Sequence, residues 1–132
     1  PMTRSVVTSE DLARLSAAPD LVRRGHFSPA VAAGPFVFVS GIGARDLTED
    51  VEGQTQQVFE YLKAVLATAG CVLDDVVKLQ AFVASPAHYP GYTAIRRRFF
   101  PSDPPASTTV VGQFVLPGML VEVDAVAYRA PR

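Results

Sequence analysis

Residues 99–128 read FFPSDPPASTTVVGQFVLPGMLVEVDAVAY, which is the most informative stretch of the chain. It predicts the end of a helix, a proline-rich loop and a short strand over residues 107–112. A turn at Leu116-Pro117-Gly118 and a final strand over residues 119–128 follow. On the final strand, valines and alanines alternate with Glu122 and Asp124. The two carboxylates therefore share one face of the strand, about 7 Å apart.

The rest of the chain supplies two more strands and two helices. The apolar run over residues 35–41 predicts a central strand that is covered on both faces. Residues 54–69 have the periodicity of an amphipathic helix that ends at Gly70, and residues 76–84 predict the next strand. This strand–helix–strand unit implies parallel pairing through a right-handed crossover. Ser85-Pro86 opens a second helix, which stops at Pro101.

The element order is therefore strand, helix, strand, helix, strand, strand. It predicts an α+β sandwich in which one sheet packs against two helices on one face. Residues 25–132 form this single domain. Residues 2–24 are an N-terminal extension with a short helix, because Thr8 and Asp11 have the spacing of a capping box. Pro1, which precedes Met2, is left out of the prediction.

Composition excludes several classes of function. The 12 basic and 13 acidic residues give a net charge of −1, which offers no attraction for nucleic acid or for an anionic membrane. No apolar run reaches membrane-spanning length, and the N-terminal stretch lacks the apolar core of a signal peptide. Cys71 is the single cysteine, which fits a reducing cytoplasm. His26 and His88 lie far apart without further ligands nearby, so we expect no metal site.

The opening stretch resembles the last third of the YjgF/RidA family, the reactive-intermediate deaminases. The matching features are a pair of aromatics, a proline, a Leu-Pro turn and an acid on the final strand: Phe99-Phe100, Pro105, Leu116-Pro117 and Glu122. The resemblance extends over residues 25–128. It implies a chorismate-mutase-like fold with one mixed sheet on two helices, and a homotrimer with clefts between subunits. It also implies a small-molecule substrate and no cofactor.

The resemblance assigns the chemistry to Glu122, which matches the glutamate that positions water for attack on an imine carbon. Ser107 stands where deaminating members have an arginine that grips the substrate carboxylate with two hydrogen bonds, so this is a divergent member. Either the substrate lacks that carboxylate, or Arg96 or Arg45 supplies the cation, or the site is catalytically silent. Ser107 and Thr109 share a strand face, where they are ordinary strand residues or donate hydroxyls to a neutral ligand.

Other substrate-binding positions follow from the same resemblance. Phe27 matches an aromatic that covers the substrate, and Ser40-Gly41 matches a strand end where a backbone N–H faces the ligand. Thr93 and Arg96 match positions that are often asparagine and tyrosine.

Three hypotheses about function follow. The first is an enamine or imine deaminase that differs from a standard 2-imino acid deaminase, because Ser107 replaces the arginine. The second is a trimeric protein that binds a small metabolite without catalysis. The third is a biosynthetic tailoring enzyme that uses the same cleft for another reaction.

Overall fold

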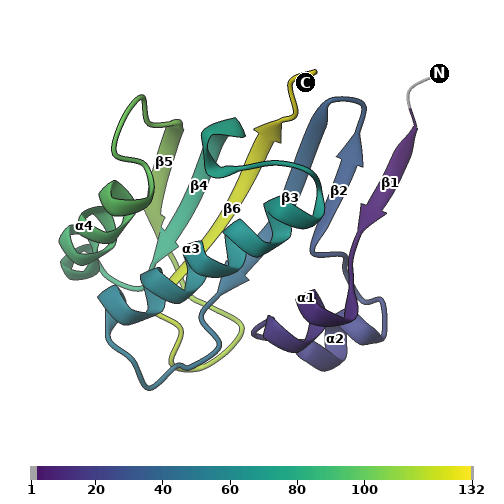
Figure 1. The fold of residues 1–132 in the computed structure, drawn as a ribbon. Coiled ribbons are helices and arrows are strands. Elements are labelled where there is room, and N and C mark those ends of the chain that lie inside the picture. Colours follow the sequence, from purple (N-terminus) through teal and green to yellow (C-terminus); the bar gives the residue numbers. More distant parts are fainter. Residues whose placement is uncertain (1–2, 132) are drawn as a thin grey trace.

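The computed structural model describes residues 3–131 and has a single six-stranded sheet (Figure 1). Met2, where the predicted extension begins, and Arg132, where the predicted domain ends, lie outside the described residues. Helices α3 and α4 cover one face of the sheet, and α1 and α2 lie at its β1–β2 side. The elements are β1 (Arg4–Val7), α1 (Glu10–Leu15), α2 (Pro19–Arg23), β2 (Ala30–Ala33), β3 (Phe36–Gly43), α3 (Val51–Thr68), η1 (Leu73–Asp75), β4 (Val76–Val83), η2 (Pro86–His88), α4 (Tyr89–Phe99), β5 (Ala106–Val111) and β6 (Val121–Tyr128).

The strand order is β1-β2-β3-β6-β4-β5. Only β4 and β5 pair in parallel among the described strands, and α4 is the connection between them. The prediction that the strands before and after α3 pair directly is wrong, because β6 lies between them. Both β3 and β4 are antiparallel to β6, so they run in the same direction without touching. The predicted α+β architecture with a mixed sheet is confirmed.

Strands β1 and β2 were not expected from the sequence. Each has four residues, and β2 reads AVAA, which has little of the β-branched and aromatic content that marks a strand. β1 belongs to the N-terminal extension and pairs with β2 at the edge of the sheet. The extension therefore continues the sheet and adds two short helices beside it.

The core lies between the sheet and α3, where side chains of both layers are fully buried. Val37 and Val39 of β3 face this core, and so do the alternating apolar residues of β6. Phe36 and Phe38 point the other way and are 41% and 49% exposed in the single chain. The expectation that this strand is covered on both faces is therefore not met within one chain. The outer face of the sheet is open and aromatic.

Helix starts follow local capping rules, at positions slightly different from those expected. Asp50 caps α3 by accepting a hydrogen bond from the backbone N–H of Gly53 at 2.8 Å, so α3 begins before residue 54. Ser9, rather than Thr8, caps α1 by accepting from Leu12 N–H at 3.0 Å. Ser85 caps the short turn η2 that leads into α4.

The Gln54 side chain connects the loop before α3 to the turn before β6. Its side chain is fully buried on α3, where its amide nitrogen donates to the carbonyl oxygens of Glu49 and Gly118 at 3.1 and 3.0 Å. Its amide oxygen accepts from the backbone N–H of Leu120 at 2.9 Å. One side chain thus fixes the turn before β6 against the loop before α3, and this turn carries the chain toward Glu122.

Candidate functional site

A cavity of about 660 Å³ lies where the end of β3 meets β6 and the corner between α1 and α2. β2 pairs with β3 only as far as Val39, and a bulge between Val39 and Ile42 interrupts the pairing of β3 with β6. The bulged segment therefore leaves the regular ladder, and the cavity opens along it. Four of the predicted site residues line this cavity, namely Phe27, Ser40, Gly41 and Glu122.

Glu122 is the only described lining residue that carries a charge at neutral pH. It lies on β6 opposite Gly43 of β3 and Phe82 of β4, and its side chain is half-buried. Burial raises the pKa of its carboxyl group, and the nearby charge of Asp124 raises it further. Burial also raises the pKa of Asp124, while Lys78 opposes that shift. The site therefore holds a carboxylate that accepts a proton more readily than a solvated one.

Gly41 leaves the space that the Glu122 carboxylate occupies. A Cβ atom on Gly41 would lie 3.0 Å from Cδ and 3.1 Å from Oε1 of Glu122. Gly41 does not have a left-handed φ, so its backbone does not require glycine. The close approach to Glu122 is the physical reason for glycine at this position. Beside it, the Ser40 hydroxyl donates to the carbonyl oxygen of Ser28 and fixes the strand end.

The other four predicted residues lie apart from this cavity, on and around β5 and α4. Arg96 Nη1 donates to Ser107 Oγ at 3.2 Å, and its guanidinium lies 5.3 Å from the centre of the Tyr92 ring. Thr93 donates to the carbonyl oxygen of Pro90. Thr109 follows on β5, paired with Ala81 of β4.

The sheet separates these two groups within one chain. β4 and β6 lie between β5 and β3 in the strand order. Ser107 is in register with Leu79, which faces the helices, whereas Glu122 is in register with Phe82, on the opposite face. A single chain therefore does not bring Ser107 to Glu122. It carries one group of predicted residues at the β3 end and another at the β5 edge. Arg45 is also absent from the described residues that line the Glu122 cavity.

Sequence reasoning missed several residues of the cavity wall. Ser16, Ala17, Ala18 and Leu21 come from the extension, and Tyr61 comes from α3. The Tyr61 hydroxyl donates to the carbonyl oxygen of Leu12 at 2.7 Å, and burial raises the pKa of Tyr61 to about 12. Nothing in the local sequence signals this wall, because it depends on a contact between residues 49 positions apart.

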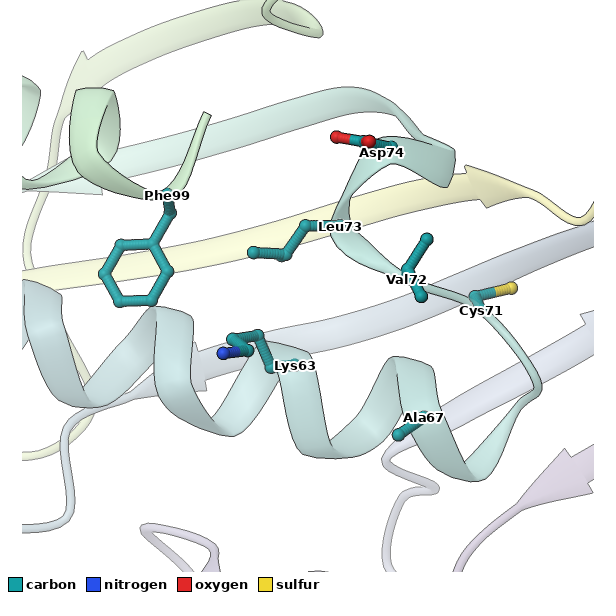
Figure 2. A pocket seen from close by; sticks show the side chains of 7 residues that line it. All are labelled: Lys63, Ala67, Cys71, Val72, Leu73, Asp74 and Phe99. Atoms are coloured by element: carbon teal, nitrogen blue, oxygen red, sulfur yellow. The ribbon is translucent and has the colours of Figure 1, made fainter. Parts of the chain in front are cut away.

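A second, smaller cavity of about 370 Å³ lies between α3, α4 and η1 (Figure 2). Lys63 and Ala67 line it from α3, and the Leu73 side chain points toward the Phe99 ring across it. Lys63 and Asp74 are its charged lining residues. None of the residues predicted for the site lines this cavity, so the chemistry is to be sought at Glu122.

Two further properties bear on the chemistry. Within residues 3–131, His, Cys, Asp and Glu side chains form no group of three or more that could hold a metal ion. No helix in the described part of the chain is long and apolar enough to cross a membrane.

A family model described as Endoribonuclease L-PSP matches residues 17–129 of the chain. The chain belongs to this family, the YjgF/RidA family. The 3-aminoacrylate deaminase RutC of Acinetobacter baylyi is 34% identical over 108 residues, which cover 77% of this chain and 86% of that protein. The RutC family protein PH0854 of Pyrococcus horikoshii is 30% identical over 111 residues, which cover 80% of this chain and 88% of that protein.

Solved structures of YjgF/RidA proteins share the fold. Rv2704 of Mycobacterium tuberculosis, described as a member of the YjgF/YER057c/UK114 family, superposes with a TM-score of 0.81 at 26% identity. The match covers 96% of this chain and 99% of that chain. The protein of unknown function PA3499 of Pseudomonas aeruginosa gives a TM-score of 0.84 at 28% identity, and covers 98% and 94% of the two chains. Both matches include most of the extension, whereas the RutC match covers less of this chain.

Proposed function

We propose that this YjgF/RidA protein is a deaminase that hydrolyses a C=N bond in a small imine or enamine. The main support for the proposal is the Glu122 carboxylate, which lines the cavity and lies in the space left by the missing side chain of Gly41. Support also comes from the relative named 3-aminoacrylate deaminase, whose named substrate is an enamine acid. The family model's description mentions a ribonuclease, but a net charge of −1 gives little attraction for RNA.

The chemistry needs one water and one group that exchanges protons. An enamine first becomes an imine by moving a proton from nitrogen to carbon. The imine takes a proton from solvent; Glu122 then holds a water near the carbon of the protonated imine and accepts a proton from that water as its oxygen bonds to the carbon and the C=N electron pair moves to nitrogen. Glu122 gives this proton to the amine nitrogen, and the C–N bond breaks as the hydroxyl group loses its proton to solvent, so that a carbonyl compound and ammonia leave. A raised carboxyl pKa suits both halves of this exchange.

The complete site is assembled from two chains of a homotrimer. The open aromatic face around Phe36 and Phe38 is suited to burial against another copy. Such packing would bring the β5 edge of one chain to the β3 end of the next. The group formed by Thr93, Arg96, Ser107 and Thr109 then faces Glu122, Phe27, Ser40 and Gly41 of its neighbour. We expect one such site at each of the three interfaces.

Arg96 supplies the positive charge that is missing because Ser107 stands in place of an arginine. Its guanidinium reaches the Ser107 hydroxyl at 3.2 Å, so its charge lies at the β5 position where the resemblance places an arginine. The single hydrogen bond to Ser107 leaves other N–H groups of Arg96 for a ligand. A guanidinium already held by Ser107 and Tyr92 is less free to form a two-pronged contact with a carboxylate. Simple 2-imino acids should therefore react slowly.

The test couples the protein to an oxidase that generates imines and follows imine loss with a trapping agent. Imines from amino acids and from amines without a carboxylate are compared. We expect faster loss with wild type and loss of that effect in Glu122→Gln, with Glu60→Gln as the matched acid-to-amide control, because Glu60 is exposed on α3 and does not line the cavity. Wild type that accelerates no imine, or Glu122→Gln that remains fully active, would overturn the proposal. The first result would leave the metabolite-binding hypothesis ahead.

A further inference from the structure

The α1–α2 corner forms one wall of the cavity that contains Glu122. Residues Ser16, Ala17, Ala18 and Leu21 contribute to this wall, and all of them belong to the N-terminal extension. Because Glu122 lines the same cavity from β6, a ligand that fills the cavity with its nitrogen at Glu122 would also contact the extension. The extension is therefore placed to contact the part of the ligand that does not react.

This corner is held firmly in place. Tyr61 of α3 donates its hydroxyl to Leu12 of α1 at 2.7 Å. Ser16 is buried, and its hydroxyl accepts from the backbone N–H of Ala18 at 2.8 Å, which fixes the turn between the helices. Arg23 of α2 pairs with Glu10 of α1 at 2.8 Å. A wall fixed by three such contacts can present a defined shape to a ligand.

The chemistry of the wall is apolar. Besides the alanines of the corner, the cavity is lined by Ile42, Met119 and large side chains at its rim. Leu21, Phe27, Val115 and Leu116 form that rim, and all four are substantially exposed in the chain. Exposed apolar side chains that gather around one cavity indicate an apolar occupant. The cavity also has the volume of sites that take ligands of drug size, so a three-carbon acid would leave most of it unfilled.

We propose that the α1–α2 corner is a subsite for a hydrocarbon group of several carbons on the substrate. The substrate class is then an imine or enamine with an alkyl or aryl side chain, whose nitrogen meets Glu122 and whose side chain lies against Leu21 and Ala17. This inference rests on the proposed deaminase function for the direction of the substrate. Binding of the hydrocarbon group to this wall can be measured without catalysis.

The experiment uses the full-length protein and a series of straight-chain 2-oxo acids with two to five side-chain carbons. These are stable products of the proposed reaction and differ only in chain length. Burial of each methylene group should raise affinity about fourfold, measured by calorimetry or by NMR titration. The kcat/KM values for the corresponding 2-imino acids, generated by an amino-acid oxidase, should rise with the same slope.

Variants of the wall test whether the extension causes the increase of affinity with chain length. Leu21→Ala should lower the gain to roughly twofold per methylene, because one apolar side of the subsite is lost. Ala17→Phe should fill the subsite and weaken the longest compounds most. Leu15→Ala is the matched control, because Leu15 is a leucine of the extension with similar exposure, 38% against 44%, that does not line the cavity. It should keep the wild-type slope.

The two proposals can fail separately. Affinity that does not change with chain length, or a slope that Leu21→Ala and Ala17→Phe leave as in wild type, would overturn the subsite even if Glu122-dependent hydrolysis is found. A clear slope that the wall variants reduce, with no hydrolysis of any imine, would keep the subsite and reject the deaminase. If Leu15→Ala lowers the slope as much as Leu21→Ala, the effect comes from the stability of the extension, and the subsite is rejected.

Discussion

Replacement of Gly41 by alanine tests whether the position of the Glu122 carboxylate determines activity. The new Cβ would lie 3.0 Å from the carboxyl carbon, whereas apolar atoms in contact are about 3.5 Å apart or more. The carboxylate must therefore move by a few tenths of an ångström, up to about 0.5 Å. Since a misplacement of about 1 Å can cost a factor of about 100 in rate, we expect kcat/KM to fall roughly tenfold.

The same change should not destabilise the fold. Gly41 does not have a left-handed φ, and Glu122 can rotate at its flexible end. Alanine restricts the unfolded chain and can add about 0.4–1 kcal/mol to the free energy of unfolding at a permissive position. The melting temperature should therefore stay constant or rise slightly while activity falls. Thermal unfolding and imine-loss kinetics on the same sample measure the two effects.

Gly112→Ala is the matched control. Its Cβ would meet only Phe82 at 3.7 Å, which is an ordinary contact, so both activity and melting temperature should stay near wild type. If Gly41→Ala keeps its kcat/KM within twofold while Glu122→Gln is inactive, the gap at Gly41 does not set the catalytic geometry. If Gly41→Ala melts well below wild type, loss of activity reports folding and the reasoning fails.

Four further predictions address charge, assembly and stability. Arg96→Ala should lower kcat/KM for substrates with a carboxylate by roughly 10- to 100-fold, whereas the exposed neighbour Arg97→Ala should not, as steady-state kinetics would show. Gln54→Leu should lower the free energy of unfolding by about 3 kcal/mol in denaturant titration, because the fully buried Gln54 side chain loses its hydrogen bonds to the backbone of Glu49, Gly118 and Leu120. Phe38→Lys should convert a trimer to monomers in sedimentation experiments, since a charge would enter the open aromatic face. Folding raises the pKa of Glu122, so the ionised carboxylate destabilises the native state. Glu122→Gln should therefore raise the melting temperature by about 1–3 °C at neutral pH. The difference in melting temperature between variant and wild type should vanish below about pH 4, where Glu122 is protonated in both the folded and the unfolded state.

The sequence predicted the elements that have strong periodicity. Helix α3 and strands β3, β4 and β6 carry long amphipathic or apolar patterns, and each lies within three residues of its expected start and end. β1 and β2 lack such patterns and become strands only because β3 offers an edge to pair with. The position of β6 between β3 and β4 also had no local signal. It is decided by long-range packing, which periodicity does not encode.

The candidate site was predictable only in part. The alternating pattern of β6 predicted that Glu122 and Asp124 share one face of the strand. The family resemblance added Phe27 and Ser40-Gly41, which line the cavity with Glu122. The bulge that opens the cavity is a break in pairing between strands, which the β3 sequence alone does not reveal. The wall from the extension depends on the Tyr61–Leu12 hydrogen bond, so it too is a property of the folded chain.

In the trimer that we propose, the open face of the sheet links assembly to activity. Phe36 and Tyr128 pack edge to face on that surface, and Phe38 lies beside them with no layer above it in the single chain. Covering these rings gives an assembly its apolar driving force, at about 25 cal/mol per Å² of buried area. In the trimer that we propose, the β5 edge of one chain meets the β3 end of the next, so the contact that covers the rings would also complete the site. Substrates with a carboxylate should then react faster in the trimer than in a monomer, because Arg96 does not line the Glu122 cavity of its own chain.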